Sequence, residues 1–530
     1  MVSLRPRSLL LVFTIIALPS LHLPAADTPA KTVYNVRDYG ALGDGKTLDS
    51  PAINAAIDAC EQAGGGTVYL PAGTYLSGSI HLRSNLNLYL DAGAVILGAP
   101  QSLKAYDPAE PFDGKGYQDG GHSFFHNSLL WGENLANVSI TGHGMINGGG
   151  LVRASRALDL WCGYPVPKTV DPSEPPGPLP DGKDLDSRRI GNKSICLKLC
   201  RHVLIGDITI FHGGHFGILV TGCNDVTIHN VTIDTNRDGM DIDCCQNIAV
   251  SDCRVNSPND DGICPKSSYA LGRNVPTENL VISNCQVSGF KEGTLLDGTM
   301  QDGNRAYGRI KFGTEANGGF RNCAITNCTF RHCLGLALEE VDGGTLENMT
   351  ISNLSMIDVI GAPIYLTTGK RNRGPDVTTV SQVKNILISD IVATGCDAQS
   401  GIQIAGLPGA PIEGVRLENI RLLFKGGGTK ESAERVPPEL GTGYPEPSKL
   451  GTMPAYGVFA RHVKDLEIAN LRVSFATDDL RPALSFVDVD DLDLDDCRAQ
   501  LANGTPAVKW DSATNVVVRN SPGIVAPASP

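Results

Sequence analysis

A short pattern of alternating apolar residues recurs along most of this chain and constrains its fold more than any other feature. The pattern is a polar residue, usually Asn or Asp, followed by apolar-x-apolar-x-x-apolar-x-apolar, and we call its first apolar residue the anchor. The anchors are Val138, Val203, Val226, Ile248, Leu280, Cys323, Met349, Ile386, Val415, Leu466, Leu492 and Val516. The intervals between several successive anchors, such as Val203, Val226 and Ile248, are typical of one coil of a parallel β-helix. The alternation indicates strands, and the polar residue before the anchor favours a turn.

The repeat predicts an all-β chain folded as a right-handed parallel β-helix, in which each coil stacks on the one before. An uncovered solenoid end would expose strand edges, so we expect a cap within residues 31–100. Asp49-Ser50-Pro51 predicts the start of a capping helix, which continues over about residues 52–62. Residues 101–530 are expected to continue the same solenoid. The wider gaps between anchors place insertions near residues 166–184, 369–376 and 426–454.

Residues 1–26 have the features of a secretory signal peptide. Arg5 and Arg7 precede an apolar run, and the small residues Ala25 and Ala26 follow it. No other run is long and apolar enough to cross a bilayer. The sequence therefore predicts a secreted or periplasmic protein.

The net charge of -13 argues against nucleic acid and anionic membranes as partners. It does not argue against an acidic polysaccharide, provided that the cleft is locally basic. The 15 cysteines cannot all pair, and several occupy apolar positions of the repeat, so we predict that they fill the core. We expect a monomer without a cofactor.

Two successive repeats place acidic residues at the same distance from their anchors. Asp238 follows Val226 at the same offset at which Asp260 follows Ile248, and Asp261 stands beside Asp260. In a solenoid, Asp238 and Asp260 would stack about 4.8 Å apart, and paired carboxylates are what glycoside hydrolysis requires. A solvated acidic stack or a calcium site is the competing interpretation. Stacked like charges cost stability, so we predict catalysis and no metal.

The motifs around these residues resemble those of glycoside hydrolase family 28, the polygalacturonases, and the N-terminal module resembles that of the pectate-lyase superfamily. Asn236-Arg237-Asp238-Gly239-Met240-Asp241 matches the family's Asn-Thr-Asp-Gly-x-Asp except at Arg237, and Asp260-Asp261-Gly262-Ile263 matches its Asp-Asp motif. The resemblance implies an inverting hydrolysis. Asp260 would be the general acid, Asp238 and Asp261 would activate water, and Asn236 and Asp241 would contact substrate. Inversion requires carboxyl groups about 6.5–9.5 Å apart.

The next coils depart from the family pattern. Glu292 has the same offset from Leu280, at a place where the family has a histidine, so it would add a fourth carboxylate to the acidic column. Residues 335–339 occupy the place of the family's Arg-Ile-Lys, which grips a substrate carboxylate. Arg309-Ile310-Lys311 lies earlier in the chain. Either an insertion at residues 294–307 re-routes the chain so that Arg309 and Lys311 reach the cleft, or this clamp is lost.

Further candidates for sugar contact are Lys266, which follows the Asp-Asp motif, and His215, which follows Val203 at the offset of the acidic column. Arg371 and Arg373 could bind a uronate or only solubilise their loop.

The sequence thus predicts a secreted glycoside hydrolase acting on pectin-type polysaccharides. A rhamnogalacturonan-specific hydrolase is the main alternative; a polysaccharide lyase and a non-catalytic carbohydrate-binding β-helix are weaker ones. Large insertions at residues 151–192 and 426–454 suggest that one end of the cleft is closed, which would favour exo attack.

Overall fold

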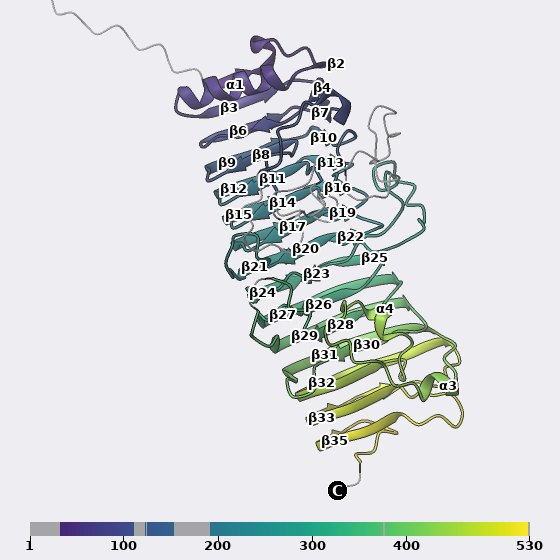
Figure 1. Ribbon diagram of the computed structural model, residues 1–530. Helices are drawn as coiled ribbons and strands as arrows, with labels where there is room; N and C mark the ends of the chain where they lie inside the picture. Colours follow the sequence, from purple (N-terminus) through teal and green to yellow (C-terminus); the bar gives the residue numbers. More distant parts are fainter. Residues whose placement is uncertain (1–31, 111–121, 123, 153–190, 375–376, 528–530) are drawn as a thin grey trace, which may run out of the picture.

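The computed structural model describes residues 32–110, 122, 124–152, 191–374 and 377–527. The predicted signal peptide and the insertion at residues 166–184 lie outside these ranges. Most of the described chain forms one long stack of coils with α1 at one end and β35 at the other (Figure 1). The predicted parallel β-helix is confirmed. None of the described helices is long and apolar enough to span a bilayer.

The N-terminal cap contains the predicted helix and the first coil. Its elements are β1 (Val33–Asn35), η1 (Val36–Tyr39), β2 (Asp44–Leu48), α1 (Ser50–Gln62), β3 (Gly66–Leu70), β4 (Gly73–Ser77) and β5 (Ile80–His81). Asp49 precedes α1 but does not cap it with its side chain. Its carboxylate instead accepts hydrogen bonds from the backbone amides of Leu42 and Gly43 at 2.8 and 3.0 Å. This carboxylate thus fixes the Gly-rich turn rather than the helix start.

Three columns of strands build the coils. The anchor column holds β6 (Leu86–Leu90), β9 (Ala136–Gly142), β12 (Arg201–Gly206), β15 (Asn224–His229), β18 (Gln246–Ser251), β21 (Thr277–Ser283) and β24 (Phe320–Thr326). The second column holds β7 (Ala94–Gly98), β10 (Met145–Asn147), β13 (Thr209–Phe211), β16 (Thr232–Asp234), β19 (Arg254–Asn256), β22 (Gln286–Ser288) and β25 (Thr329–Cys333). The third column holds β8 (Leu130–Glu133), β11 (Ile195–Lys198), β14 (Ile218–Thr221), β17 (Met240–Asp243), β20 (Ile263–Lys266), β23 (Lys311–Phe312), β26 (Leu336–Glu340), β28 (Ile364–Thr368) and β30 (Ile402–Ala405).

Towards the C-terminus the columns merge into longer strands. These are β27 (Thr345–Val359), β29 (Gln382–Cys396), β31 (Ile412–Gly426), β32 (Val458–Thr477), β33 (Leu484–Asp495) and β35 (Val508–Arg519), with the short β34 (Arg498–Ala499). Two short helices, α3 (Lys430–Ala433) and α4 (Pro447–Leu450), lie in the insertion between β31 and β32, and η2 (Gln101–Leu103) follows β7.

The predicted anchors pair with one another in register. Val203, Val226, Ile248 and Leu280 form one continuous row, and Met349, Ile386, Val415, Leu466, Leu492 and Val516 form another. The polar residue before an anchor has a positive φ, for example 57° at Asn137 and 58° at Asn247. Asn tolerates this left-handed conformation better than most residues, which explains its recurrence there.

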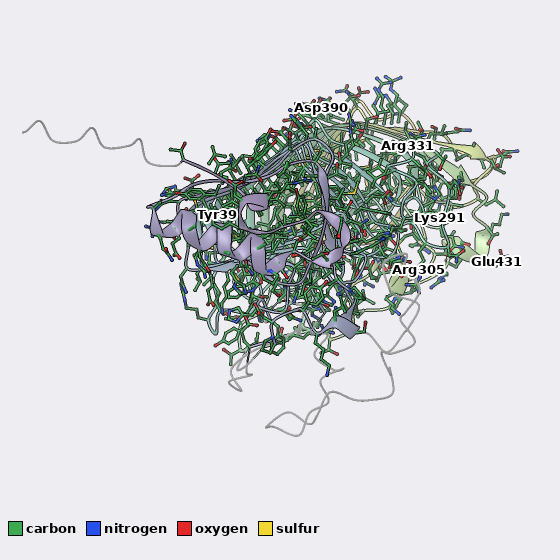
Figure 2. The ribbon with its side chains drawn as sticks, turned by 90° about the horizontal axis from the view of Figure 1, so that it is seen from above. Tyr39, Lys291, Arg305, Arg331, Asp390 and Glu431 are labelled. Atoms are coloured by element: carbon green, nitrogen blue, oxygen red, sulfur yellow. The ribbon has the colours of Figure 1, made fainter. Side chains whose placement is uncertain are left out.

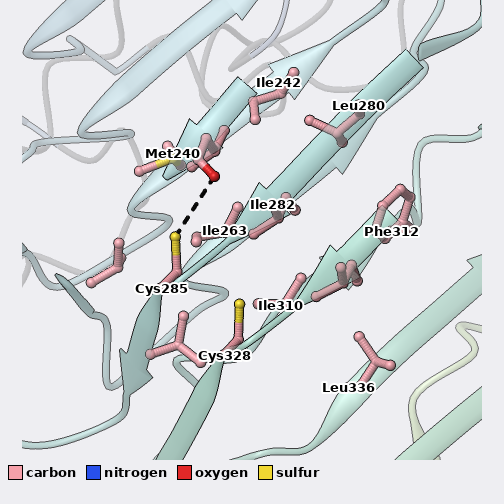
Figure 3. Close-up of a cluster of buried hydrophobic side chains, with 14 of the residues drawn as sticks. Met240, Ile242, Ile263, Leu280, Ile282, Cys285, Ile310, Phe312, Cys328 and Leu336 are labelled. Atoms are coloured by element: carbon pink, nitrogen blue, oxygen red, sulfur yellow. Dashed lines mark hydrogen bonds between the residues drawn. The ribbon is translucent and has the colours of Figure 1, made fainter. Parts of the chain in front are cut away.

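One continuous apolar core fills the solenoid from Tyr34 to Ile524. Each fully buried aliphatic side chain contributes about 1.5–3 kcal/mol to the hydrophobic driving force. The described cysteines, among them Cys285 and Cys328, are buried and free, and these two lie among the aliphatic side chains of the core (Figure 3). The prediction that cysteines fill the core is confirmed for the described residues.

Candidate active site

Three consecutive coils bring the motif residues together beside the third column of strands. Met240 of β17 pairs in parallel with Ile263 of β20, and Ile263 forms a parallel bridge with Ile310, which directly precedes β23. The segments that enter these strands therefore lie side by side. They carry Asp238, the Asp260-Asp261 pair and Arg309.

Asp238 and Asp261 occupy equivalent positions in their coils, two residues before the paired Met240 and Ile263. The backbone amide of Asp261 donates a hydrogen bond to Oδ1 of Asp238 at 3.1 Å. The prediction that Asp260 stacks on Asp238 is therefore wrong by one residue. The turn between β19 and β20 is one residue longer than the turn between β16 and β17, and the extra residue shifts the register.

The three carboxylates nevertheless converge. One oxygen of each of Asp238, Asp260 and Asp261 lies within 4.8 Å of the others. This distance is shorter than the separation of about 6.5–9.5 Å that is usual between the acid and base of inverting glycosidases. The spacing therefore gives no support of its own to an inverting mechanism, which rests on the family resemblance.

Buried cations hold Asp261 in its ionised form. Arg309 Nε donates to Asp261 Oδ1 at 2.8 Å, and Lys311 Nζ lies 3.1 Å from Oδ2. Burial by itself would raise the pKa of Asp261, but Lys311 and Arg309 outweigh it and lower this pKa below its usual range. Asp261 therefore stays ionised beside the cavity.

Asp238 has the opposite character. Burial, with the neighbouring charges of Asp260 and Asp241, raises its pKa well above the usual range, although Arg237 and Lys266 oppose the shift. Asp260 is more exposed, with 27% of its side chain accessible, and Arg237 Nε lies 3.1 Å from its Oδ2. The site thus combines a buried carboxyl group with a raised pKa, Asp238, and an ionised neighbour, Asp261.

The chain is re-routed, as the first of the two explanations expected, and it brings Lys311 into the cavity wall and Arg309 to the buried side of Asp261. The chain leaves β22 at Ser288, makes a long excursion and returns to begin β23 at Lys311. Lys311 pairs with Ala337 of the following coil, so residues 335–339 lie one coil beyond the place predicted for Arg-Ile-Lys. Because the insertion lengthens this coil, the spacing of residues from Leu280 did not predict this register.

The same excursion removes Glu292 from the acidic column, so the prediction of a fourth carboxylate there is wrong. Glu292 lies in the inserted segment and its Oε1 is 3.0 Å from His212 Nδ1. Lys291 and Arg305, which belong to this segment, lie at the periphery of the molecule in the view along the stack (Figure 2). Glu292 is not among the residues that line the cavity beside Asp260.

A polar cavity of about 230 Å³ lies next to the three carboxylates. It is smaller than most ligand pockets, which measure about 300–1,000 Å³, so it suits a short part of a polymer. Its lining consists of His122, Phe216, Arg237, Asp238, Asp260, Asp261, Lys266, Lys311, Glu315, Arg373 and Tyr444. The predicted Lys266 is buried in this wall and its Nζ lies 2.9 Å from Glu315 Oε2.

Four other predicted substrate contacts do not line this cavity. Asp241 is fully buried, and its Oδ2 lies 3.6 Å from His122 Nε2. His215 is fully buried and contacts Nη1 of Arg237 at 2.8 Å, so it positions this arginine. Arg309 is 1% exposed. Neither these three residues nor the half-buried Asn236 are among the residues that line the cavity.

Several lining residues escaped prediction because they come from distant segments. His122 precedes β8, and Tyr444 lies in the insertion between β31 and β32. The centre of the Tyr444 ring lies 5.7 Å from Lys311 Nζ, a cation–π contact within the cavity wall. Arg237 interrupts the family motif, and this mismatch was the signal that could have identified it.

The acidic triad is the one group of His, Cys, Asp and Glu side chains among the described residues whose geometry could hold a metal ion. Arg237, Arg309 and Lys311 contact its carboxylates at 2.8–3.1 Å. These cations already supply the positive charge that a metal ion would bring, so the donor set does not favour one.

Fold and site together define a parallel β-helix that carries an acidic triad beside a polar cavity. The family described as rhamnogalacturonase A/epimerase, pectate lyase-like, matches residues 33–264. A probable polygalacturonase from Vitis vinifera is 27% identical over 257 residues, which cover 46% of this chain and 47% of that protein. An exo-poly-alpha-D-galacturonosidase from Dickeya chrysanthemi is 28% identical over 248 residues, 42% of this chain and 40% of that protein.

Among solved structures, the family 28 exopolygalacturonase from Yersinia enterocolitica aligns over 92% of this chain and 78% of its own, with a TM-score of 0.59 and 20% identity. This likeness shows a shared fold. The resemblance to polygalacturonases and the pectate-lyase superfamily is thereby confirmed. The chain spans less than half the length of the two curated relatives that it matches.

Proposed function

We propose that this protein is a glycoside hydrolase that cleaves pectin-type polysaccharides or oligosaccharides. The convergence of Asp238, Asp260 and Asp261 within 4.8 Å beside a polar cavity carries the proposal. The similarity to proteins named polygalacturonase and exo-poly-alpha-D-galacturonosidase supports it. Export directed by residues 1–26 would bring the enzyme to a substrate that is too large to enter a cell.

The proton arrangement suggests how the triad divides the work. The Asp238–Asp260 pair carries one proton, and Asp260, its more exposed member, delivers this proton to the glycosidic oxygen. Asp238 passes its proton to Asp260 and becomes ionised. Asp261, ionised beside Arg309 and Lys311, then accepts a proton from the attacking water with help from Asp238. General acid and base catalysis of this kind contributes about 10²–10⁴-fold to a rate.

A rhamnogalacturonan-specific hydrolase is the second candidate. The matching family is described as rhamnogalacturonase A/epimerase, and this match includes all three aspartates of the triad. Both candidates use the same carboxylates and differ only in the sugars that flank the cleaved bond.

Product analysis on polygalacturonan and on rhamnogalacturonan oligosaccharides tests the proposal. We expect new reducing ends on at least one substrate without the ultraviolet absorbance of unsaturated sugars. Proton NMR of the first products should show an inverted anomeric configuration. Unsaturated products would instead establish a lyase, and absence of cleavage on both substrates would contradict the proposed function.

A further inference from the structure

Glu446 brings a carboxylate from a distant insertion into the cation pair of the active site. It directly precedes α4, and its Oε1 accepts a hydrogen bond from Arg309 Nη2 at 2.6 Å although 137 residues separate them. The same oxygen lies 3.8 Å from Lys311 Nζ. Glu446 thus contacts Arg309 and Lys311. The resemblance to polygalacturonases implies that an Arg-Ile-Lys of this kind grips a substrate carboxylate.

The charge of this cation pair is fully compensated within the protein. Arg309 and Lys311 face Asp261 at 2.8 and 3.1 Å, Glu339 at 3.7 Å each, and Glu446. Three carboxyl groups therefore surround two cations, and burial raises the pKa of one of them, Glu339, to about 7. A sugar carboxylate placed on the same pair would add a further negative charge in a site where Arg309 is 1% and Lys311 is 3% exposed, and such burial of like charge is unfavourable.

The segment that carries Glu446 is firmly packed, so a substrate would not readily displace its carboxylate. Leu450 and Met453 belong to a buried cluster with Ala337, Tyr365 and Phe459 on the outer face of the solenoid. Arg461 Nη1 also donates to the carbonyl of Pro437 at 2.7 Å, which anchors the earlier part of the insertion. The insertion therefore presents Glu446 as a fixed part of the wall.

The position next to Glu446 is still available to a sugar. Lys311 and Tyr444 both line the cavity, where Lys311 Nζ lies over the Tyr444 ring, 5.7 Å from its centre. Lys311 also contacts Asp261, so a sugar in the cavity against Lys311 and Tyr444 would be directly beside the proposed base.

We propose that Glu446 is a specificity-determining residue. Its carboxylate takes the place of a substrate carboxylate on Arg309 and Lys311, so the part of the cavity lined by Lys311 and Tyr444 accepts a neutral sugar and rejects a uronate. The inference rests on the proposed function and deepens it. It favours a polymer in which a neutral sugar flanks the cleaved bond, such as rhamnogalacturonan, over plain polygalacturonan.

The wild-type enzyme gives the first test. We expect kcat/KM on rhamnogalacturonan oligosaccharides to exceed that on polygalacturonan oligosaccharides of equal length by at least tenfold. Equal or reversed values would overturn the inference while leaving glycoside hydrolysis established. Cleavage of neither substrate would contradict the proposed function instead.

Glu446→Gln gives the second test, since the amide keeps the size of the side chain and removes its charge. We expect the preference for the neutral sugar to fall at least tenfold in kcat/KM. Glu439→Gln is the matched control, because Glu439 lies in the same insertion but pairs with Arg461 and His462 and should leave the preference unchanged. An unchanged preference in Glu446→Gln would overturn the inference.

Binding of two monosaccharides tests the subsite without turnover. Galactose and galacturonate differ only in the group at C6, so titration calorimetry on the wild type should show weaker binding of galacturonate. Glu446→Gln should gain affinity for galacturonate and keep that for galactose. Tighter binding of galacturonate by the wild type would overturn the inference even if the variant did not fold.

Discussion

The backbone amide of Asp261 donates a hydrogen bond to the carboxylate of Asp238 at 3.1 Å across 23 residues of sequence. This contact ties two successive coils together at the point where the acidic triad forms. It also fixes the register of the triad, because Asp238 and Asp261 become equivalent positions and Asp260 becomes the additional residue that faces the cavity. The geometry of the site is thus set by strand pairing, and each carboxylate acquires a distinct environment.

Replacement of Asp260 by Asn should abolish most of the activity without unfolding the protein. Asp260 lines the cavity and 27% of its side chain is accessible, so little packing depends on its charge. We expect kcat to fall by about 10²–10⁴-fold, with an unchanged circular dichroism spectrum. Asp252→Asn, at an exposed turn with a φ of 58°, should retain full activity. Retained activity in Asp260→Asn would assign the proton donor to another residue.

Removal of the charge of Arg237 should shift the pH profile. Arg237 lowers the pKa of Asp238, so Arg237→Gln should raise the pKa of the protonated pair and move the alkaline limb of kcat/KM to higher pH. Arg237→Lys keeps the positive charge, so its alkaline limb should shift less than that of Arg237→Gln. Arg254→Gln, on the exposed side of β19, should leave the alkaline limb unchanged. Coincident alkaline limbs in wild type and Arg237→Gln would contradict the proton-sharing pair.

Asp241 should make the folded protein less stable as the pH rises. Burial raises its pKa to about 7, whereas an unfolded chain has an Asp pKa of about 3.9. The folded state therefore binds this proton more tightly, so its contribution is present below about pH 4 and is lost as the pH rises to about 7. The loss is at most about 4 kcal/mol, since one pKa unit corresponds to about 1.4 kcal/mol.

Urea-induced unfolding of the wild type and of Asp241→Asn at pH 4.5 and 7.5 measures this contribution. The wild type should lose more of its free energy of unfolding between the two pH values than the variant does. Asp252→Asn serves again as the control, because its carboxylate is exposed. Equal pH dependence in wild type and Asp241→Asn would show that this carboxyl group ionises normally in the folded protein.

Chelators should leave the activity unchanged. Arg237, Arg309 and Lys311 contact the triad carboxylates and compensate their charge without a metal ion. We expect the same rate before and after dialysis against EDTA, and no stimulation by added calcium. A loss of activity that calcium restores would instead support the competing interpretation of the triad as a calcium site.

The sequence by itself determined the solenoid and the identity of the acidic triad. Alternation fixes which side chains face the core, and Asn before each anchor supplies the left-handed turn residue, so the anchors could be aligned without any structure. Both signals are local, and they repeat from coil to coil. The positions of Asp238, Asp260 and Asp261 in adjacent coils followed from the same regularity, except for the single-residue shift in the turn before Ile263.

Only the tertiary structure decided what surrounds the triad. Glu292 and Arg309 lie on either side of an insertion whose path no periodic pattern encodes, so residue counting placed the first in the site and left the second in doubt. His122, Tyr444 and Glu446 reach the cavity or its cations from segments far away in the chain. Such contacts depend on how irregular loops pack against the solenoid, and that packing is set by long-range burial and charge pairing rather than by local sequence.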